Sequence, residues 1–229
     1  MSSSPEDGSV TFRDALRDAW AVLFPVECAG CDSPDRGLCG ECLAALHPLP
    51  TPRLGPDGLS VVTALGYEGR VRRVILALKE QGRTDVAAVL ARPLEAAISR
   101  AREKHPHAEL ALIPTSVRAY RRRGYDPVWL IVRRIGLRPP RVLVPRRATS
   151  RQKTLGAAER GSNLSGALVA VSRLEGRSFL LVDDVMTTGA TLGEAARAIR
   201  AAGGDVVGAA TLAFTKRLLP FRDNAPGED

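Results

Sequence analysis

The pattern of hydrophobic and polar positions changes near residue 59 of the 229-residue chain. Beyond that point, short apolar runs alternate with longer stretches whose apolar residues recur at helical spacing. The runs expected as strands are Val61–Tyr67, Leu110–Ile113, Arg141–Val144, Phe179–Val182 and Val206–Ala213. The stretches expected as helices are Val71–Lys79, Asp85–Lys104, Pro127–Ile135, Ala157–Ala167 and Thr191–Ala202. This alternation predicts an α/β domain over residues 59–219, with a mostly parallel sheet and flanking helices.

The residues before this domain follow other patterns. Residues 1–10 and 220–229 are expected to be disordered tails, by composition. Residues 11–47 are expected to hold an amphipathic helix and a small cysteine module. The apolar stripe of that helix can pack against the next segment or bind a partner. The segment 48–58 is rich in proline and glycine, which predicts a linker.

Composition limits the class of protein. A hydrophobic fraction of 45% supplies enough apolar material for a core and excludes wholesale disorder. No apolar run approaches the roughly 18 residues that a membrane span needs. The polar, acidic start does not resemble a secretory signal peptide, so a cytoplasmic location is expected.

Positive charge is concentrated in one part of the chain. The formal net charge is +8, and residues 118–160 alone contain 13 basic and 2 acidic side chains. A basic region of this kind favours a polyanionic ligand or partner. The alternative is a general bias toward arginine, which outnumbers lysine 29 to 4.

Four cysteines form two closely spaced pairs, Cys28-x2-Cys31 and Cys39-x2-Cys42. Disulfides are not expected in a cytosolic chain. Two such turns facing each other supply four thiolates, which favours a structural Zn²⁺ site. A module as short as residues 26–47 cannot bury a core, so the metal would supply its folding energy. An iron–sulfur cluster and a site that has lost its metal are the alternatives.

The stretch Phe179–Leu192 contains the most informative motif. An apolar strand is expected to end at two adjacent carboxylates, Asp183 and Asp184. The small residues of Thr187–Thr191 then lead into a helix, where backbone N–H groups and hydroxyls can bind a phosphate. Because the paired acids would repel that phosphate, they are expected to face hydroxyl groups or a bridging Mg²⁺.

This stretch resembles the phosphoribosyl-pyrophosphate (PRPP) signature of type I phosphoribosyltransferases. The resemblance implies that Asp183 and Asp184 form the catalytic pair that faces the ribose hydroxyls, with Mg²⁺ bound beside PRPP. It also implies that the 5′-phosphate is held by Thr187, Thr188, Gly189, Ala190 and Thr191.

Further segments narrow the resemblance to the competence-associated ComF family, over residues 24 to about 215. They are Phe24-Pro25 before the cysteines, Arg72–Lys79 with Gly82, Pro114–Tyr125, Thr149-x-x-Gln152-x-x-Leu155 and Arg160-x-x-Asn163. The resemblance implies a type I phosphoribosyltransferase-like fold with an N-terminal zinc ribbon. It also implies a role in DNA uptake, with PRPP, single-stranded DNA and a DNA-uptake helicase as partners. One departure is Gly124-Tyr-Asp-Pro127, where the family usually has Gly-Phe-Asn-Gln.

Two basic segments follow expected strands, Pro114–Asp126 and Arg146–Gly161. In the family resemblance they correspond to a pyrophosphate loop and a flexible loop. Fixed guanidinium groups there can stabilise a leaving pyrophosphate. The candidates are Arg122, Arg123, Gly124, Lys153 and Arg160. The alternative for each arginine is a solvated surface side chain.

Three functions are compatible with these features. The chain can be a PRPP-dependent glycosyltransferase of nucleotide metabolism, a protein that handles single-stranded DNA during natural transformation, or a PRPP-sensing regulator without turnover. An aromatic fraction of 4% weakens the DNA hypothesis, because single-strand binding surfaces usually stack bases on aromatic rings. These features are compatible both with an enzyme and with a binding protein that has no activity.

Overall fold

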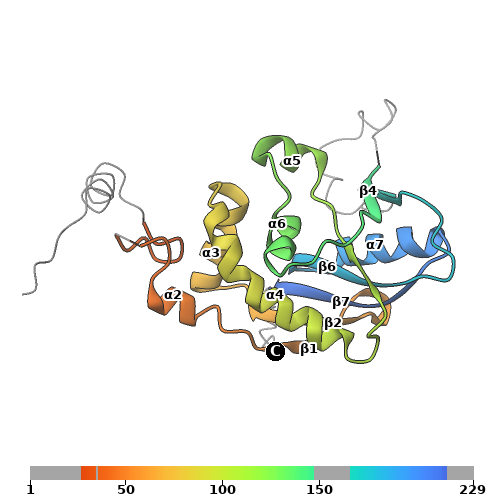
Figure 1. Cartoon of the computed structure of the whole chain (residues 1–229), viewed down its shortest axis with the longest axis horizontal. Helices are drawn as coiled ribbons and strands as arrows, with labels where there is room; N and C mark the ends of the chain where they lie inside the picture. Colours follow the sequence, from red (N-terminus) through yellow and green to blue (C-terminus); the bar gives the residue numbers. More distant parts are fainter. Residues whose placement is uncertain (1–26, 35, 147–165, 216–229) are drawn as a thin grey trace, which may run out of the picture.

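A computed structural model describes residues 27–34, 36–146 and 166–215, and its main feature is a five-stranded sheet (Figure 1). The strand order is β1-β2-β7-β6-β3. The strands are β1 (Thr51–Leu54), β2 (Ser60–Gly66), β3 (Glu109–Leu112), β6 (Ser178–Met186) and β7 (Asp205–Phe214). All neighbours are parallel except β1, which pairs antiparallel with β2 at one edge. The expected α/β fold with a mostly parallel sheet is therefore confirmed.

Helices cover both faces of this sheet. One face packs against α3 (Gly69–Glu80), α4 (Ala87–Arg102) and α6 (Pro127–Arg134), and the other against α7 (Ala190–Ala201). A short 3-10 turn, η2 (Thr84–Val86), precedes α4.

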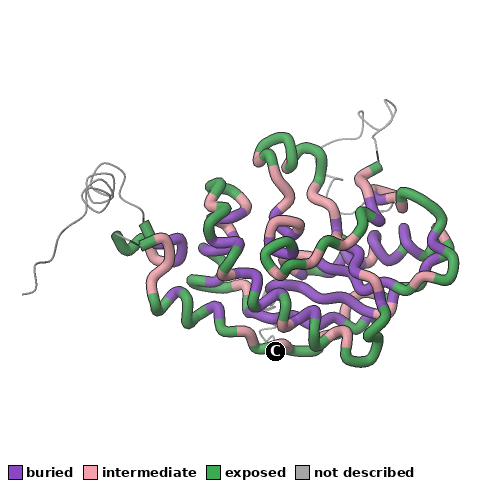
Figure 2. Tube along the Cα trace, in the orientation of Figure 1, coloured by how far each residue is buried: buried purple, intermediate pink, exposed green. Residues whose placement is uncertain are grey.

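The side chains of β6 alternate between these two layers, as the pleat of a strand requires. Leu180 and Val182 join the core with α3, α4 and α6, whereas Phe179 and Leu181 join the core with α7. These central strands are the most continuously buried part of the molecule (Figure 2). A strand buried on both faces explains why the sequence shows an unbroken apolar run here.

A second, two-stranded sheet pairs β4 (Leu143–Pro145) with β5 (Leu168–Ala170) in antiparallel register. The run Arg141–Val144 is thus partly a strand, but it does not join the main sheet as the alternating pattern suggests. The reason is local packing, because Leu143 and Leu168 are buried in the same cluster as α7. The expected helix Ala157–Ala167 lies almost entirely outside the described residues.

Two short elements appear where the sequence suggested irregular chain. The proline- and glycine-rich segment 48–58 contains β1 and the 3-10 turn η1 (Pro56–Gly58). The edge position of β1 accommodates Pro52, which has no N–H group to donate.

The basic run expected as a loop contains α5 (Val117–Arg123). Ser116 caps its N-terminus by accepting a hydrogen bond from Ala119 N, at 3.3 Å, and Gly124 ends it with a φ of 80°. Pro127 opens α6 at its first turn, as expected for a proline there, and Asp126 caps that helix.

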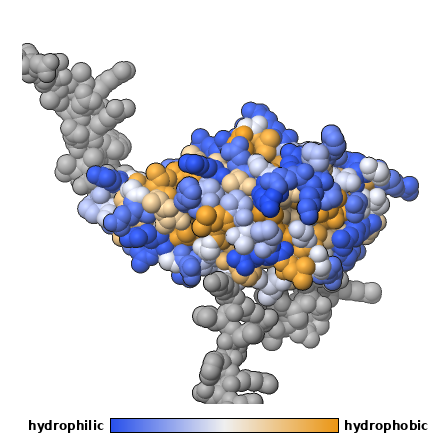
Figure 3. All heavy atoms as spheres, turned by 90° about the horizontal axis from the view of Figure 1, so that it is seen from below, coloured by the Kyte–Doolittle hydropathy of each residue, from blue (hydrophilic) through white to orange (hydrophobic). Residues whose placement is uncertain are grey.

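The cysteine module contains α2 (Gly40–Ala44) and lies against α3. Ala29 and Leu46 of this module are buried in the same cluster as Val74 of α3. Residues 1–26 and 216–229, with the expected tails and the amphipathic helix, lie outside the described part of the chain. Within that part, none of the helices combines the length and apolarity that crossing a bilayer requires. On the face shown in Figure 3, apolar surface is divided into small groups by hydrophilic side chains.

Candidate functional site

A polar cavity of about 260 Å³ lies where β3 and β6 end. This is the edge of a parallel sheet at which ligands bind in α/β proteins. Residues from α3, β6, α5 and the start of α7 meet there. The lining consists of Lys79, Ile113, Pro114, Thr115, Ser116, Ala119, Arg123, Val128, Asp183, Asp184, Val185 and Thr191.

Asp183 and Asp184 both line this cavity, but they lie within β6 rather than after its end. The strand continues past them because its pairing with β7 extends to Met186. One carboxylate oxygen of Asp183 accepts a hydrogen bond from the backbone N–H of Asp184, at 2.8 Å. Burial, and then the charge of Asp184, raise the pKa of Asp183 to about 8. The cavity therefore favours the neutral form of the Asp183 carboxyl group more than water does.

Lys79 lies in the last turn of α3 and lines the same cavity. Its ammonium nitrogen lies 3.0 Å from one carboxylate oxygen of Asp184 and 2.9 Å from the other. Both side chains are mostly buried, with exposed fractions of 23% and 15%. The signal that could have identified it is its place at the C-terminal end of an apolar helix, in a segment that resembles the ComF family.

The segment Thr187–Thr191 connects β6 to α7 at the rim of the cavity. Gly189 is the N-cap of α7 with a φ of 78°, and the Thr188 hydroxyl accepts a hydrogen bond from Ala190 N at 3.3 Å. Thr187, Thr188, Ala190 and Thr191 are all exposed, and of these four Thr191 belongs to the lining of the cavity. The backbone N–H groups at this helix end are thus positioned to receive an anion.

The five basic-loop candidates have different environments. Arg123 lines the cavity with only 11% of its side chain exposed, and it pairs with Glu80 of α3 at 2.8 Å. Arg122 pairs with the other oxygen of Glu80 at 2.5 Å and is not part of the lining. Gly124 ends α5, which is a structural role. Lys153 and Arg160 lie outside the described residues.

The sequence did not single out Thr115 and Ser116, which also line the cavity. The backbone N–H of Thr115 donates to Asp126 at 2.9 Å, and the other oxygen of Asp126 accepts from Trp129 N at 3.1 Å. Asp126 therefore holds the corner after β3 against the start of α6. The signal available in the sequence was Ser116 as an N-cap, with Gly124 as the corresponding C-cap.

The four cysteine side chains come together as their spacing predicts. Their sulfur atoms all lie within 4.8 Å of one another, and the sulfur atoms of Cys31 and Cys39 are 3.6 Å apart. A Cβ atom on Gly30 would lie 2.5 Å from the Cys42 sulfur, so only glycine fits at this position. The cluster is compatible with a tetrahedral zinc ribbon.

The electrostatics of the cluster also fit a cation. Burial disfavours the Cys28 thiolate, but hydrogen bonds from the backbone N–H groups of Cys39, Gly30 and Cys31 outweigh it and lower its pKa to about 6. Burial and the neighbouring sulfur atoms raise the pKa of Cys42. A bound metal ion would supply the positive charge that lets all four thiols ionise together.

Comparison with known proteins agrees with these features. The model of the phosphoribosyl transferase domain family matches residues 140–225. The DNA utilization protein YhgH of Escherichia coli O6:H1 is 31% identical over 183 residues, which cover 74% of this chain and 81% of that protein. The chain belongs to the ComF family of YhgH-like proteins.

Other ComF-type relatives give similar values. YhgH of Salmonella typhimurium is 30% identical over 173 residues, which cover 70% of this chain and 76% of that protein. Among solved structures, the orotate phosphoribosyltransferase of Mycobacterium tuberculosis H37Rv matches with 17% identity and a TM-score of 0.32. That match covers 76% of this chain and 92% of the enzyme.

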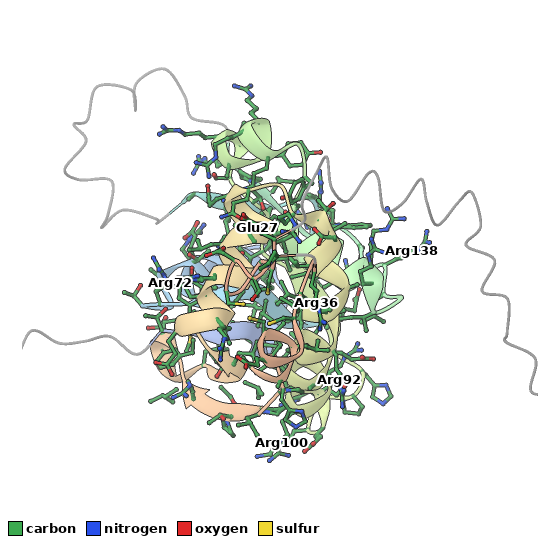
Figure 4. All side chains as sticks on the ribbon, turned by 90° about the vertical axis from the view of Figure 1, so that its left-hand side faces the viewer. Glu27, Arg36, Arg72, Arg92, Arg100 and Arg138 are labelled. Atoms are coloured by element: carbon green, nitrogen blue, oxygen red, sulfur yellow. The ribbon has the colours of Figure 1, made fainter. Side chains whose placement is uncertain are left out.

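In this ComF protein, hydrogen bonds and ion pairs from arginine side chains connect the cysteine module to the α/β domain. Arg83 donates to the carbonyl oxygens of Glu27 at 2.9 Å and Gly37 at 3.0 Å. Two ion pairs add to this contact, Arg73–Asp32 at 2.8 Å and Arg70–Glu41 at 2.5 Å. Figure 4 views this end of the molecule, with Glu27 and Arg36 near its centre. The module and α3 therefore form one packed unit.

Proposed function

We propose that this protein binds PRPP together with Mg²⁺ in the cavity between β6, α5 and α7. The observation that carries the proposal is the pair Asp183–Asp184 beside the N-terminus of α7, with Arg123 in the same lining. Acids, a phosphate-binding helix end and a guanidinium group match the three parts of PRPP. These parts are the ribose hydroxyls, the 5′-phosphate and the pyrophosphate.

Each part of the ligand has a proposed partner. Asp183 and Asp184 accept hydrogen bonds from the ribose hydroxyls, and a protonated Asp183 can also donate one. The backbone N–H groups of 187–191 bind the 5′-phosphate at the start of α7. Arg123 and the hydroxyl of Ser116 face the pyrophosphate. Mg²⁺ would supply further positive charge against the pyrophosphate oxygens when it is bound.

The ion pair between Lys79 and Asp184 has a role in this proposal. Without ligand, Lys79 neutralises one of two adjacent acids, which reduces their mutual repulsion. With ligand, the same ammonium group lies next to a phosphate-bearing sugar and favours its binding. Both effects require that Lys79 stay charged.

The binding proposal is tested by calorimetric titration of the purified protein with PRPP, with and without Mg²⁺. Ribose 5-phosphate tests the helix-end site alone, and inorganic pyrophosphate tests the arginine side alone. We expect PRPP to bind more tightly than either fragment, because it engages both sides of the cavity. Equal affinity for PRPP and ribose 5-phosphate would contradict this arrangement.

Transferase activity and sensing differ in what happens to bound PRPP. A transferase releases pyrophosphate when an acceptor is supplied, whereas a sensor returns intact PRPP. Pyrophosphate release assayed against a panel of nucleobases therefore separates the two. The outcome does not affect the binding proposal.

The cysteine cluster is proposed to hold a structural zinc ion. All four ligands would be sulfur, which leaves no open position for a catalytic water. Elemental analysis of the purified protein should give about one zinc per chain.

Single-stranded DNA is a second proposed ligand, and two observations favour it. Residues 117–146 contain nine arginines and one acidic residue, and the relatives bear the name DNA utilization protein. Binding to the DNA backbone releases counterions. The affinity should therefore fall with salt with a log–log slope of about −0.7 per phosphate contacted. Absence of binding at about 50 mM salt would remove this second function.

A further inference from the structure

Helix α5 separates the polar cavity described above from a second cavity. Its N-cap Ser116 and its residues Ala119 and Arg123 line the first cavity. Its residues Val117, Tyr120 and Arg121 line the second. Each set recurs at three- or four-residue spacing, so the two sets occupy different faces of the helix. The two cavities share Pro114 and Thr115 at the corner after β3, but each is lined by different side chains of α5.

The second cavity has a volume of about 470 Å³ and lies between α5 and β4. Figure 1 shows that these two elements rise on the same side of the main sheet. Its walls are largely apolar, with Pro114 at the corner after β3 and Leu143, Val144 and Pro145 along β4. Such a slot suits a flat hydrophobic group better than an ion.

Two side chains in this cavity are unusually exposed for their type. Tyr120 is 49% exposed and Val117 is 48% exposed, and both belong to the face of α5 that lines the slot. Tyr120 does not pack in the core, since α5 contains no buried residue. An exposed aromatic ring beside an apolar wall is a surface on which a nucleobase can stack.

The second cavity also contains positively charged side chains. Arg121 and Arg141 line it, and within the described part of the chain neither has an acidic side chain within 4.0 Å. The acidic residue of the lining is Asp126, whose two oxygens already accept hydrogen bonds from Thr115 N and Trp129 N. The two arginines are thus available to a phosphate.

We infer that the cavity between α5 and β4 binds one nucleotide unit, with its base stacked on Tyr120 and its phosphate at Arg121 and Arg141. This inference rests on the proposed function, because it names the ligand that would be held beside PRPP. The unit can be a free mononucleotide or one residue of a single strand, which share this chemistry.

The test measures binding of a fluorescently labelled oligothymidylate by anisotropy at about 50 mM salt. Tyr120→Ala should weaken binding by about 5- to 150-fold, the loss of one stacked base. Tyr120→Phe keeps the ring and should bind like the wild type. Arg141→Ala should weaken binding and make its salt dependence shallower by about 0.7 in log–log slope. Arg138→Ala is the matched control, because Arg138 is exposed, lines neither cavity and points away from the molecule in Figure 4.

Two arms distinguish the source of the nucleotide. Displacement of the oligonucleotide by thymidine monophosphate, lost in Tyr120→Ala, assigns the slot to mononucleotides. Strand binding that the monophosphate does not displace, but that still depends on Tyr120, assigns it to a single strand. Tyr120→Ala with wild-type affinity for both probes would overturn the inference, as would a wild-type protein that binds neither. Because Tyr120 does not line the first cavity, PRPP affinity measured on the same variant reports separately on the proposed function.

Discussion

The ammonium nitrogen of Lys79 lies 2.9 and 3.0 Å from the two carboxylate oxygens of Asp184. This contact joins the end of α3 to the middle of the candidate site, across 105 positions of sequence. The same helix contacts the cysteine module through Val74, whose Cγ2 would lie 3.3 Å from a Cβ on Gly30. One helix therefore touches both features that the sequence marks as functional.

We expect Lys79 and Asp184 to be energetically coupled. Lys79→Met leaves a mostly buried carboxylate beside Asp183, and Asp184→Asn leaves a mostly buried ammonium group, so each single variant should be destabilised. The double variant should lose less than the sum, with a coupling of about 1–2 kcal/mol in the free energy of unfolding. Urea denaturation of the four proteins measures this value. A coupling near zero would mean that the contact does not persist in solution.

The pKa of Asp183 predicts a pH dependence of stability. Because folding raises this pKa to about 8, the folded protein retains a proton that the unfolded chain releases above about pH 4. Stability contributed by this group is therefore present at low pH and is lost as the pH rises toward 8, by at most about 1.4 kcal/mol per pH unit. Asp183→Asn should remove that slope. Denaturation curves at several pH values between about 5 and 8.5 compare the two proteins, and parallel profiles would contradict the raised pKa.

The two glycines of the cysteine pairs should respond differently to the same substitution. In Gly30→Ala the new Cβ would lie 2.5 Å from the Cys42 sulfur and 2.9 Å from its Cβ, so the cluster must shift. At Gly40 a Cβ would meet nothing within 4 Å. We expect Gly30→Ala to lower the zinc content and to destabilise the protein by about 1–3 kcal/mol.

Gly40→Ala is the matched control and should keep both the metal and the stability. Elemental analysis and thermal unfolding of the two variants give the comparison. Loss of zinc in both variants, or in neither, would contradict the close packing of Gly30 against Cys42.

Gly189 should be more sensitive than Gly193, one turn along α7. A Cβ on Gly189 would lie 2.8 Å from Cδ of Pro56, and its φ of 78° disfavours any side chain. At Gly193 the nearest atom would be Cγ of Pro56 at 3.4 Å, which is ordinary contact. Gly189→Ala should therefore lower both stability and PRPP affinity. Gly193→Ala should preserve PRPP affinity. Calorimetric titration with PRPP and thermal unfolding of the two variants give the comparison. If Gly189→Ala kept both the affinity and the stability of the wild type, the predicted clash with Pro56 would be wrong.

The sequence predicted the main sheet well because its central strands are buried on both faces. The unbroken apolar run Phe179–Val182 predicts a core strand, and it forms the buried first half of β6. The cysteine cluster was equally accessible to prediction, since four thiols at paired spacing have few alternative arrangements. In both cases local chemistry alone determined the structure.

Features that depend on distant contacts were harder to predict. The pairing of β4 with β5 depends on their packing against α7. The strand β1 forms because it can pair with the free edge of β2. In the sequence Lys79 is an ordinary lysine at the end of a helix. Only the folded structure shows that it lies beside Asp184. The arginine run at 121–123 also divides by helical phase, because α5 turns Arg121 and Arg123 toward different cavities. No pattern within the run itself reveals that division.

The central claim is that Asp183 and Asp184 hold PRPP, and calorimetric titration with PRPP and Mg²⁺ tests it most directly. The variant carries both Asp183→Asn and Asp184→Asn. The control is Asp205→Asn, the same type of change at the start of β7. This position lies at the opposite end of the sheet from the cavity. We expect the wild type and the control to bind PRPP with equal affinity, and the double variant to stay folded by circular dichroism without measurable binding. A folded double variant that binds PRPP as tightly as the wild type would contradict the account.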